Sequence, residues 1–220
     1  MKYHFQFRDV FASWPALLDG IVVTLALSGI AMTGGLVIGI LGASARLYGP
    51  QPVRALAAAY TEIIRNTPLL IQLFIVFFGL PGIGLRLDAP VAAAVALTVN
   101  LGAYASEIVR AGLQAIPRTQ IEAGLALSLS KFQVFRHIVL FPALKLMFPA
   151  LASQFVLLLL ATSAVSLISV GDLFHAASII QSRTFRDFEV YTVVGAVYLL
   201  LALVFRMAFA LLYRGVFGRR

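Results

Sequence analysis

The stretch IEAGLALSLSKFQVFRHIVLFP, residues 121–142, is the only long, charged, water-compatible segment between strongly apolar parts of this chain. Around it the sequence is unusually hydrophobic, with 61% hydrophobic residues and a mean hydropathy of +0.96. A soluble domain carries roughly 45–50% apolar residues. The composition therefore indicates an integral membrane protein, and a polar insert in such a chain is typical of a docking surface.

Long runs without charge flank this insert on both sides. A helix needs about 20 apolar residues to cross a hydrocarbon core of about 30 Å. By this measure we predict one all-α transmembrane domain over residues 1–220, with a polar loop at 113–145. The five predicted spans are 18–45, 53–80, 89–112, 146–170 and 190–214.

The basic residues predict the orientation of the five spans, whose two termini must face opposite sides. Lysine and arginine gather on the cytoplasmic side of membrane proteins. One side carries Arg46, Arg54, Arg110, Arg118, Lys131, Arg136, Lys145, Arg214, Arg219 and Arg220, and the other carries Lys2, Arg8, Arg86, Arg183 and Arg186. We expect the insert and the C-terminus to be cytoplasmic and the N-terminus, without a removable signal peptide, to be outside. This asymmetry explains the net charge of +8 better than nucleic-acid binding does.

The insert itself is predicted to form a helix-turn-helix. Pro117 suits the first turn of the first helix, and Glu122 lies near its positive end. A second helix is predicted over 131–140, because Ser130 can cap it, Gln133 occupies its third position and Pro142 follows its end.

This pattern resembles the coupling loop of bacterial ATP-binding-cassette (ABC) importers, which the ATPase subunit grips. The loop reads Glu-Ala-Ala, three residues, Gly, nine residues, Ile, one residue, Leu-Pro. Glu122, Ala123, Ile138 and Leu140 match it at the required spacing. Gly124 replaces the second alanine, Ser128 replaces the glycine, and proline comes one place late. Because glycine is flexible, we expect the kink between the helices to have moved to Gly124.

Three further segments resemble the polar amino acid permeases within these importers, the branch that takes up histidine, glutamate, glutamine or arginine. They are EIIRNTPLLIQ at 62–72, EIVRAG at 107–112 with Ile-Pro at 116–117, and SRTFR at 182–186 followed by FEVY at 188–191. With the insert, the resemblance covers about residues 20–213. It implies a type I ABC importer permease with five membrane helices, located in the bacterial inner membrane.

The resemblance also implies partners. These are two ATPase subunits that bind ATP and Mg²⁺, a second permease subunit that is the same chain or a paralogue, and a periplasmic amino-acid-binding protein. The chain has no glycine-rich phosphate loop, so we expect no enzymatic activity and no cofactor of its own. The implied ATPase contact is Glu122, Ala123, Gly124, Leu125, Ala126, Leu127, Ser128, Leu129 and Ser130.

Polar residues inside the apolar spans are candidates for the substrate pathway. Glu62 and Arg65 lie one helical turn apart and are predicted to pair, while Pro68 breaks the helix and frees a carbonyl. The alternative is a structural role, as an ion pair for Glu62 and Arg65 or as interhelical hydrogen bonds in the third span. For the serine and threonine residues of the fourth span, packing is the favoured interpretation. The pathway candidates are Glu62, Arg65, Asn66, Thr67, Gln72, Asn100, Tyr104, Glu107, Thr162, Ser163 and Ser166, and Gln154 joins the polar set of the fourth span.

The remaining features narrow the function. Leu160 and Ala161 stand where similar permeases often carry a charged pair, which favours a neutral or acidic amino acid. Residues 172–189 are predicted to form an amphipathic helix on the outer membrane surface. The histidines are scattered, so no metal site is expected. A passive channel or a membrane scaffold subunit with a docking loop remains the alternative function.

Overall fold

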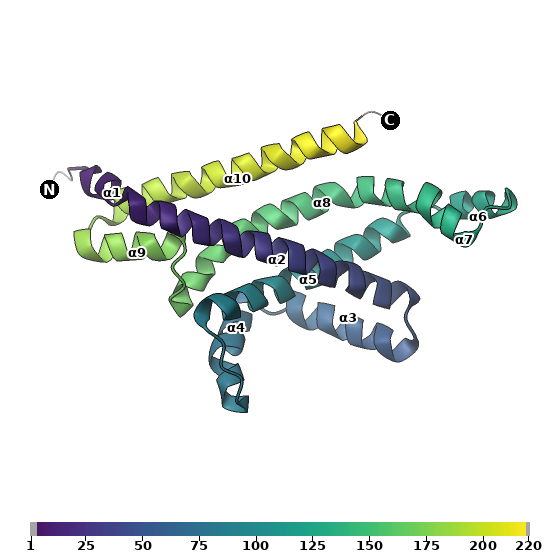
Figure 1. Ribbon diagram of the computed structural model, residues 1–220, viewed down its shortest axis with the longest axis horizontal. Helices are drawn as coiled ribbons and strands as arrows, with labels where there is room; N and C mark the ends of the chain where they lie inside the picture. Colours follow the sequence, from purple (N-terminus) through teal and green to yellow (C-terminus); the bar gives the residue numbers. More distant parts are fainter. Residues whose placement is uncertain (1–3, 219–220) are drawn as a thin grey trace.

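The computed structural model describes residues 4–218, and this part of the chain contains helices and loops but no strand (Figure 1). Lys2, Arg219 and Arg220, which entered the charge count, lie outside the described residues. The elements are α1 Arg8–Ala12, α2 Trp14–Tyr48, α3 Gln51–Arg65, α4 Leu69–Phe74, η1 Ile75–Gly79, η2 Leu80–Ile83, α5 Ala89–Gln114, α6 Arg118–Ala126, α7 Lys131–Val134, η3 Phe135–Val139, α8 Leu140–Ala161, η4 Thr162–Ile168, α9 Leu173–Thr184 and α10 Asp187–Phe217.

Four stretches of the described helices are long and apolar enough to cross a membrane, and a bent pair of helices makes a fifth. The straight spans are α2, α5, Lys131–Ile168 and α10. The bent pair joins Gln51–Arg65 to Leu69–Ile83 at an angle of 107°. The predicted all-α fold with five membrane helices is confirmed, and the second span has a break that divides it in two.

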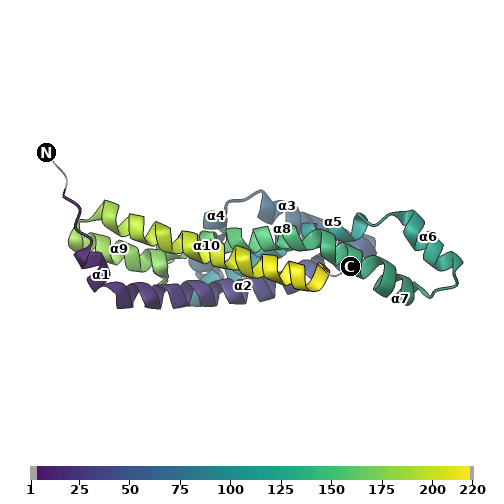
Figure 2. The ribbon, with the colours of Figure 1, turned by 90° about the horizontal axis from the view of Figure 1, so that it is seen from above.

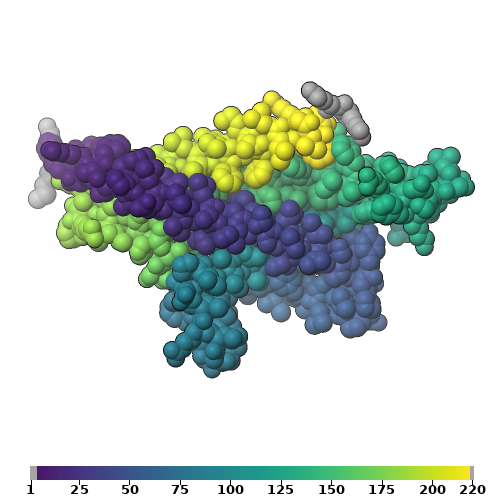
Figure 3. Space-filling view, viewed as in Figure 1, coloured from purple at the N-terminus to yellow at the C-terminus, as the bar shows by residue number. Residues whose placement is uncertain are grey.

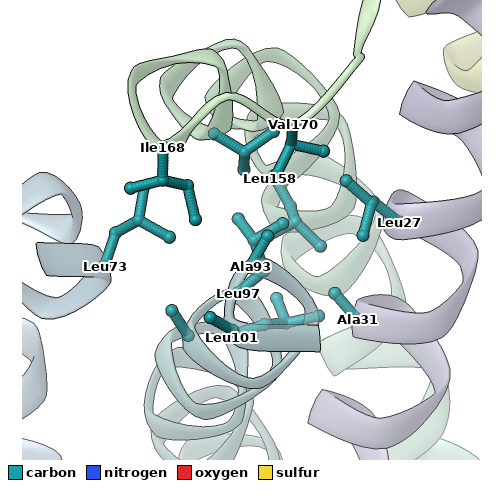
Figure 4. Close-up of a cluster of buried hydrophobic side chains, with 12 residues drawn as sticks. Leu27, Ala31, Leu73, Ala93, Leu97, Leu101, Leu158, Ile168 and Val170 are labelled. Carbon is teal, nitrogen blue, oxygen red and sulfur yellow. The ribbon is translucent and has the colours of Figure 1, made fainter. Parts of the chain in front are cut away.

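The centre of the bundle is the packing of α2 against α5. Gly39 allows this approach, since a Cβ there would lie 2.5 Å from Cβ of Ala105. Toward the α9 end, buried aliphatic side chains of α2, α4, α5, α8 and η4 form one apolar cluster (Figure 4). Leu97 and Leu101 of α5 lie at its middle and are fully buried. This cluster holds four of the spans together on one side of the break.

The two ends of the molecule differ in the elements they carry. α1 and α9 lie at one end, whereas α6, α7 and the C-terminal end of α10 lie toward the other in both ribbon views (Figures 1 and 2). The segment from α4 to η2 projects from the body of the molecule (Figure 3). It exposes large apolar side chains, including Ile75 and Phe78. This arrangement places the insert at the far end of the bundle from the N-terminus.

Residues 172–189 contain the predicted helix, α9, but its apolar face was placed wrongly. Leu173, Ala177 and Ile180 are buried against α1, α2 and α10, and they do not lie free for the membrane surface. Asp172 begins the helix and accepts a hydrogen bond from the backbone N–H of His175 (2.9 Å). α9 is therefore an integral part of the bundle end.

Candidate functional site

The break in the second span lies at Asn66, Thr67 and Pro68, between α3 and α4. Proline has no backbone N–H to donate, and it disfavours helical backbone at the residue before it. The backbone at Pro68 is extended, with φ −60° and ψ 138°. The last carbonyl groups of α3 are consequently left without helical partners, as the sequence predicted.

Side chains of the break and of α4 bond these carbonyl groups. Nε2 of Gln72 donates to the carbonyl oxygens of Ile64 (2.7 Å) and Thr67 (3.0 Å), and also contacts Oγ1 of Thr67 (2.9 Å). Asn100 on α5 donates to Oε1 of Gln72 (3.0 Å). Gln72 is buried, so it acts as the support behind the break and fixes it against α5.

Beside the break lies an open cavity of 430 Å³, lined by residues of the break, α4, α5 and α8. Its polar lining comes from three separate parts of the chain. Of the predicted pathway residues, Arg65, Asn66, Thr67, Asn100 and Tyr104 line it, together with Gln154. The remaining lining is Pro68 and the aliphatic side chains of Leu69, Leu157, Leu158 and Ala161. The cavity is large enough for an amino acid. Its wall carries several hydrogen-bonding side chains and one positive charge.

That positive charge is Arg65, and the predicted pairing of Arg65 with Glu62 is wrong. Arg65 Nη1 lies 3.9 Å from Glu107 Oε2, and its guanidinium carbon lies 5.5 Å from the centre of the Tyr104 ring. Glu62 instead accepts a hydrogen bond from Nδ2 of Asn66 (3.1 Å). Arg65 is thus paired with a carboxylate on another helix, α5, and not with the carboxylate one turn away on its own helix.

Glu107 joins three helices through arginines. It forms ion pairs with Arg46 of α2 and with Arg110 of its own helix (2.7 Å), and Arg46 also donates to Oγ1 of Thr61 (3.1 Å). Two arginines other than Arg65 therefore already neutralise the Glu107 carboxylate. Arg65 keeps 41% of its side chain exposed beside the cavity. Arg46 is not among the site residues predicted from the sequence, and the one signal for it was its position at the end of a span.

The polar residues of the fourth span lie elsewhere. Thr162, Ser163 and Ser166 belong to η4, and each hydroxyl donates to a carbonyl group three residues earlier. Thr162 is fully buried. None of the three lines the cavity, and neither do Glu62, Gln72 and Glu107. These contacts support the packing alternative for η4, whereas Gln154, one turn earlier than Leu158, does reach the cavity.

The insert contains the two predicted helices, α6 and α7. Ser130 and Gln133 form the predicted capping box, each side chain bonding the backbone of the other. The predicted end of the second helix is wrong, because α7 continues through η3 into α8 and Pro142 lies in the first turn of α8. The π-helical turn of η3 changes the hydrogen-bond spacing before the proline. The insert is therefore joined to the fourth span by continuous helix.

The turn between α6 and α7 shows what the two departures at 124 and 128 do. Ser128 has φ +61°, the left-handed conformation that glycine adopts without strain. Gly124 is helical, so the expected kink there is wrong. A Cβ at Gly124 would collide with Ile138, so glycine serves the close packing of α6 on η3. Leu127 at the turn and Phe132 beyond it are exposed, at 77% and 70%.

The sequence is similar to a family of membrane transport proteins and to several of its members. A family model described as "Binding-protein-dependent transport system inner membrane component" matches residues 35–218. The probable glutamine ABC transporter permease protein GlnM of Bacillus subtilis is 37% identical over 194 residues, covering 88% of this chain and 90% of its own. The glutamine transport system permease protein GlnP of Escherichia coli is 37% identical over 201 residues, covering 89% and 92%.

Two solved structures share the fold. A crystal structure of an amino acid ABC transporter with histidines superposes with a TM-score of 0.90 at 34% identity, covering 96% of this chain and 99% of that one. The MetNI methionine ABC transporter, in an inward-facing conformation, superposes with a TM-score of 0.74 at 22% identity, covering 91% and 96%. The second likeness concerns the fold alone.

Proposed function

We propose that this chain, which belongs to the family of binding-protein-dependent transport system inner membrane components, passes an amino acid through the cavity at the break in its second span. It is the membrane subunit of an amino acid ABC importer, as its relatives are. Membership in this family speaks against the alternative of a passive channel or scaffold. The observation that carries the proposal is the cavity, in which three segments bring polar groups together around Arg65.

In this proposal Arg65 binds the carboxylate that every amino acid carries. Its guanidinium is held over Tyr104 and is shared with a Glu107 carboxylate that Arg46 and Arg110 already neutralise. A substrate carboxylate in the cavity would therefore be its best acceptor, and an arginine can bind it through two parallel hydrogen bonds. Asn66, Thr67 and Gln154 lie on the same wall and are placed to bind the remaining polar groups.

The lining also favours a substrate without positive charge on its side chain. Among the described residues that line the cavity, none is acidic, and Arg65 would repel a second cation. We therefore propose a neutral or acidic amino acid. Glutamine is the first candidate, since the relatives from Bacillus subtilis and Escherichia coli are named as glutamine transport permeases.

Energy would come from outside this chain. We propose that two ATPase subunits, which hold ATP and Mg²⁺, bind the surface made by residues 122–130. Glu122 would meet a basic residue of the ATPase, and the exposed Leu127 would enter its groove. Because α7 is continuous with α8, closure of the ATPases would move the helix that lines the cavity. A second permease subunit and a periplasmic binding protein complete the proposed alternating-access transporter.

The test is amino acid uptake into proteoliposomes that contain the assembled transporter and a loaded binding protein. Replacing Arg65 with glutamine should weaken uptake about tenfold or more, because a charge-assisted hydrogen bond contributes about 1.5–3 kcal/mol. Arg54→Gln removes the same charge from the same helix away from the cavity, and should leave uptake within about twofold of the wild type by the small effect of surface charges. Equal uptake by the two variants would refute the assignment of Arg65.

A further inference from the structure

Two charged side chains from the middle of the membrane part of this chain, one basic and one acidic, have no ionic partner in the part of the chain that the structure describes. Arg206 on α10 and Glu62 on α3 are both exposed, and no ion pair among residues 4–218 includes either. Glu62 has its hydrogen bond with Asn66, while Arg206 lines an apolar groove of 560 Å³ between α8 and α10. Charges inside a membrane are costly unless they are paired or hydrated.

Arg206 lies too deep for a lipid headgroup to be its partner. Along α10 it lies about 12 Å before Arg214, where the predicted span ends, at a rise of about 1.5 Å per residue. Phe209, one turn away, contacts Phe148 and Phe155 in the middle of α8. By contrast Arg214, in the last turn of α10, can reach the membrane surface. We therefore expect the Arg206 guanidinium to form an ion pair with a carboxylate of the assembled protein.

Glu62 lies at the same depth as Arg206. α5 and α8 run antiparallel, and Gly112 of α5 abuts Met147 of α8. Six residues further along α8, Ser153 lines the groove with Arg206, and it must lie level with residues near 106 on α5. Glu62 is one turn from Arg65, which contacts Tyr104 and Glu107 on α5. Both unpaired charges are thus level with residues 104–107.

A two-fold axis perpendicular to the membrane keeps every residue at its own depth, and it makes each contact twice, with residue i meeting j and j meeting i. α10 is also the least covered of the four straight spans, with 11% of its most apolar window buried. We propose that Glu62 pairs with Arg206 of a second copy of this chain, and Arg206 with that copy's Glu62. This rests on the two-permease arrangement in the proposed function.

The pair would also complete the rim of the cavity. Asn66 lines the cavity, and its side chain is held in place by the hydrogen bond that it donates to Glu62. An arginine of the second copy bound to Glu62 would therefore hold the break from outside, as Gln72 holds it from inside. The isolated chain has half of this support.

Cross-linking tests the contact cleanly, because the chain contains no cysteine. Two differently tagged copies are co-expressed, one with Glu62→Cys and the other with Arg206→Cys, and membranes are treated with a short bis-methanethiosulfonate. We use a linker because an ion pair leaves the two Cβ atoms farther apart than a disulfide allows. We expect a covalent dimer carrying both tags. Val204→Cys in place of Arg206→Cys is the control, since Val204 is 57% exposed on another face of α10.

A product from the control as strong as that from Arg206→Cys would overturn the proposal, and so would no product at all.

Exchanging the two charges is a second, independent test of the pair. Glu62→Arg and Arg206→Glu should each lower the yield of purified dimer several-fold, and the double variant should restore it. If the double variant is no better than either single one, the pair does not exist. If the cysteine pair gives no cross-linked product while the chain still purifies as a dimer that takes up amino acid, this contact is refuted and the proposed transport function remains intact.

Discussion

At the scale of single residues, Ser128 determines the turn of the insert. A left-handed backbone costs an L-residue roughly 1–2 kcal/mol, and Ser128 holds it at φ +61°. We predict that Ser128→Gly slows hydrogen exchange of the α6 and α7 amides by an amount equivalent to about 1 kcal/mol. Ala123→Gly, in helical backbone of the same insert, should accelerate exchange instead. Faster exchange in Ser128→Gly would contradict the strain.

Asp172 gives a second prediction at this scale. Burial raises the pKa of its carboxyl group above the ordinary value, although it accepts a hydrogen bond from the backbone of His175. A raised pKa in the folded state favours folding with the proton bound, and this contribution is lost as pH rises through that pKa. We therefore expect Asp172→Asn to gain thermal stability over the wild type as pH rises above about 4. A difference that is constant with pH would exclude this.

Among the helical elements, the broken second span depends on one buried amide. Gln72→Leu removes the donor for two backbone carbonyl groups and the acceptor for Asn100. Leaving buried polar groups unpaired costs about 1–3 kcal/mol, so the detergent-purified variant should melt at a lower temperature. Gln154→Leu changes a comparable amide at the cavity wall and should melt close to the wild type. Similar melting of both variants would contradict the supporting role of Gln72.

Much of this element scale could be predicted from the sequence. The length of the apolar runs predicted the membrane spans, and Pro68 predicted the break in the second one. Ser130 and Gln133 predicted the capping box. Long-range choices could not be predicted. Arg65 reaches Glu107 on another helix, and Gln72 turns back onto Ile64, because tertiary packing decides between partners that local spacing leaves equal. Pro142 predicts a helix end, yet the helix continues past it, because a proline is tolerated in the first turn of α8.

At the scale of the whole molecule, the positive-inside orientation predicts which end meets which solution. The absence of cysteine allows single labels to be placed at will. In membranes that contain this chain without ATPase subunits, Leu127→Cys in the insert should react with an impermeant maleimide in inverted vesicles and stay unreacted in intact cells or spheroplasts. Phe185→Cys, 80% exposed after α9, should show the reverse pattern. Labelling of Leu127→Cys from outside would invert the proposed topology.

The central claim is that an amino acid occupies the cavity between the break, α5 and α8 with its carboxylate at Arg65. A cryo-EM structure of the assembled transporter in saturating glutamine tests it most directly. We predict density for one amino acid in the cavity of this subunit, with carboxylate oxygens in hydrogen-bond range of the Arg65 guanidinium and the side chain near Asn66 and Gln154. Density bound elsewhere in the bundle, or a carboxylate turned away from Arg65, would contradict it.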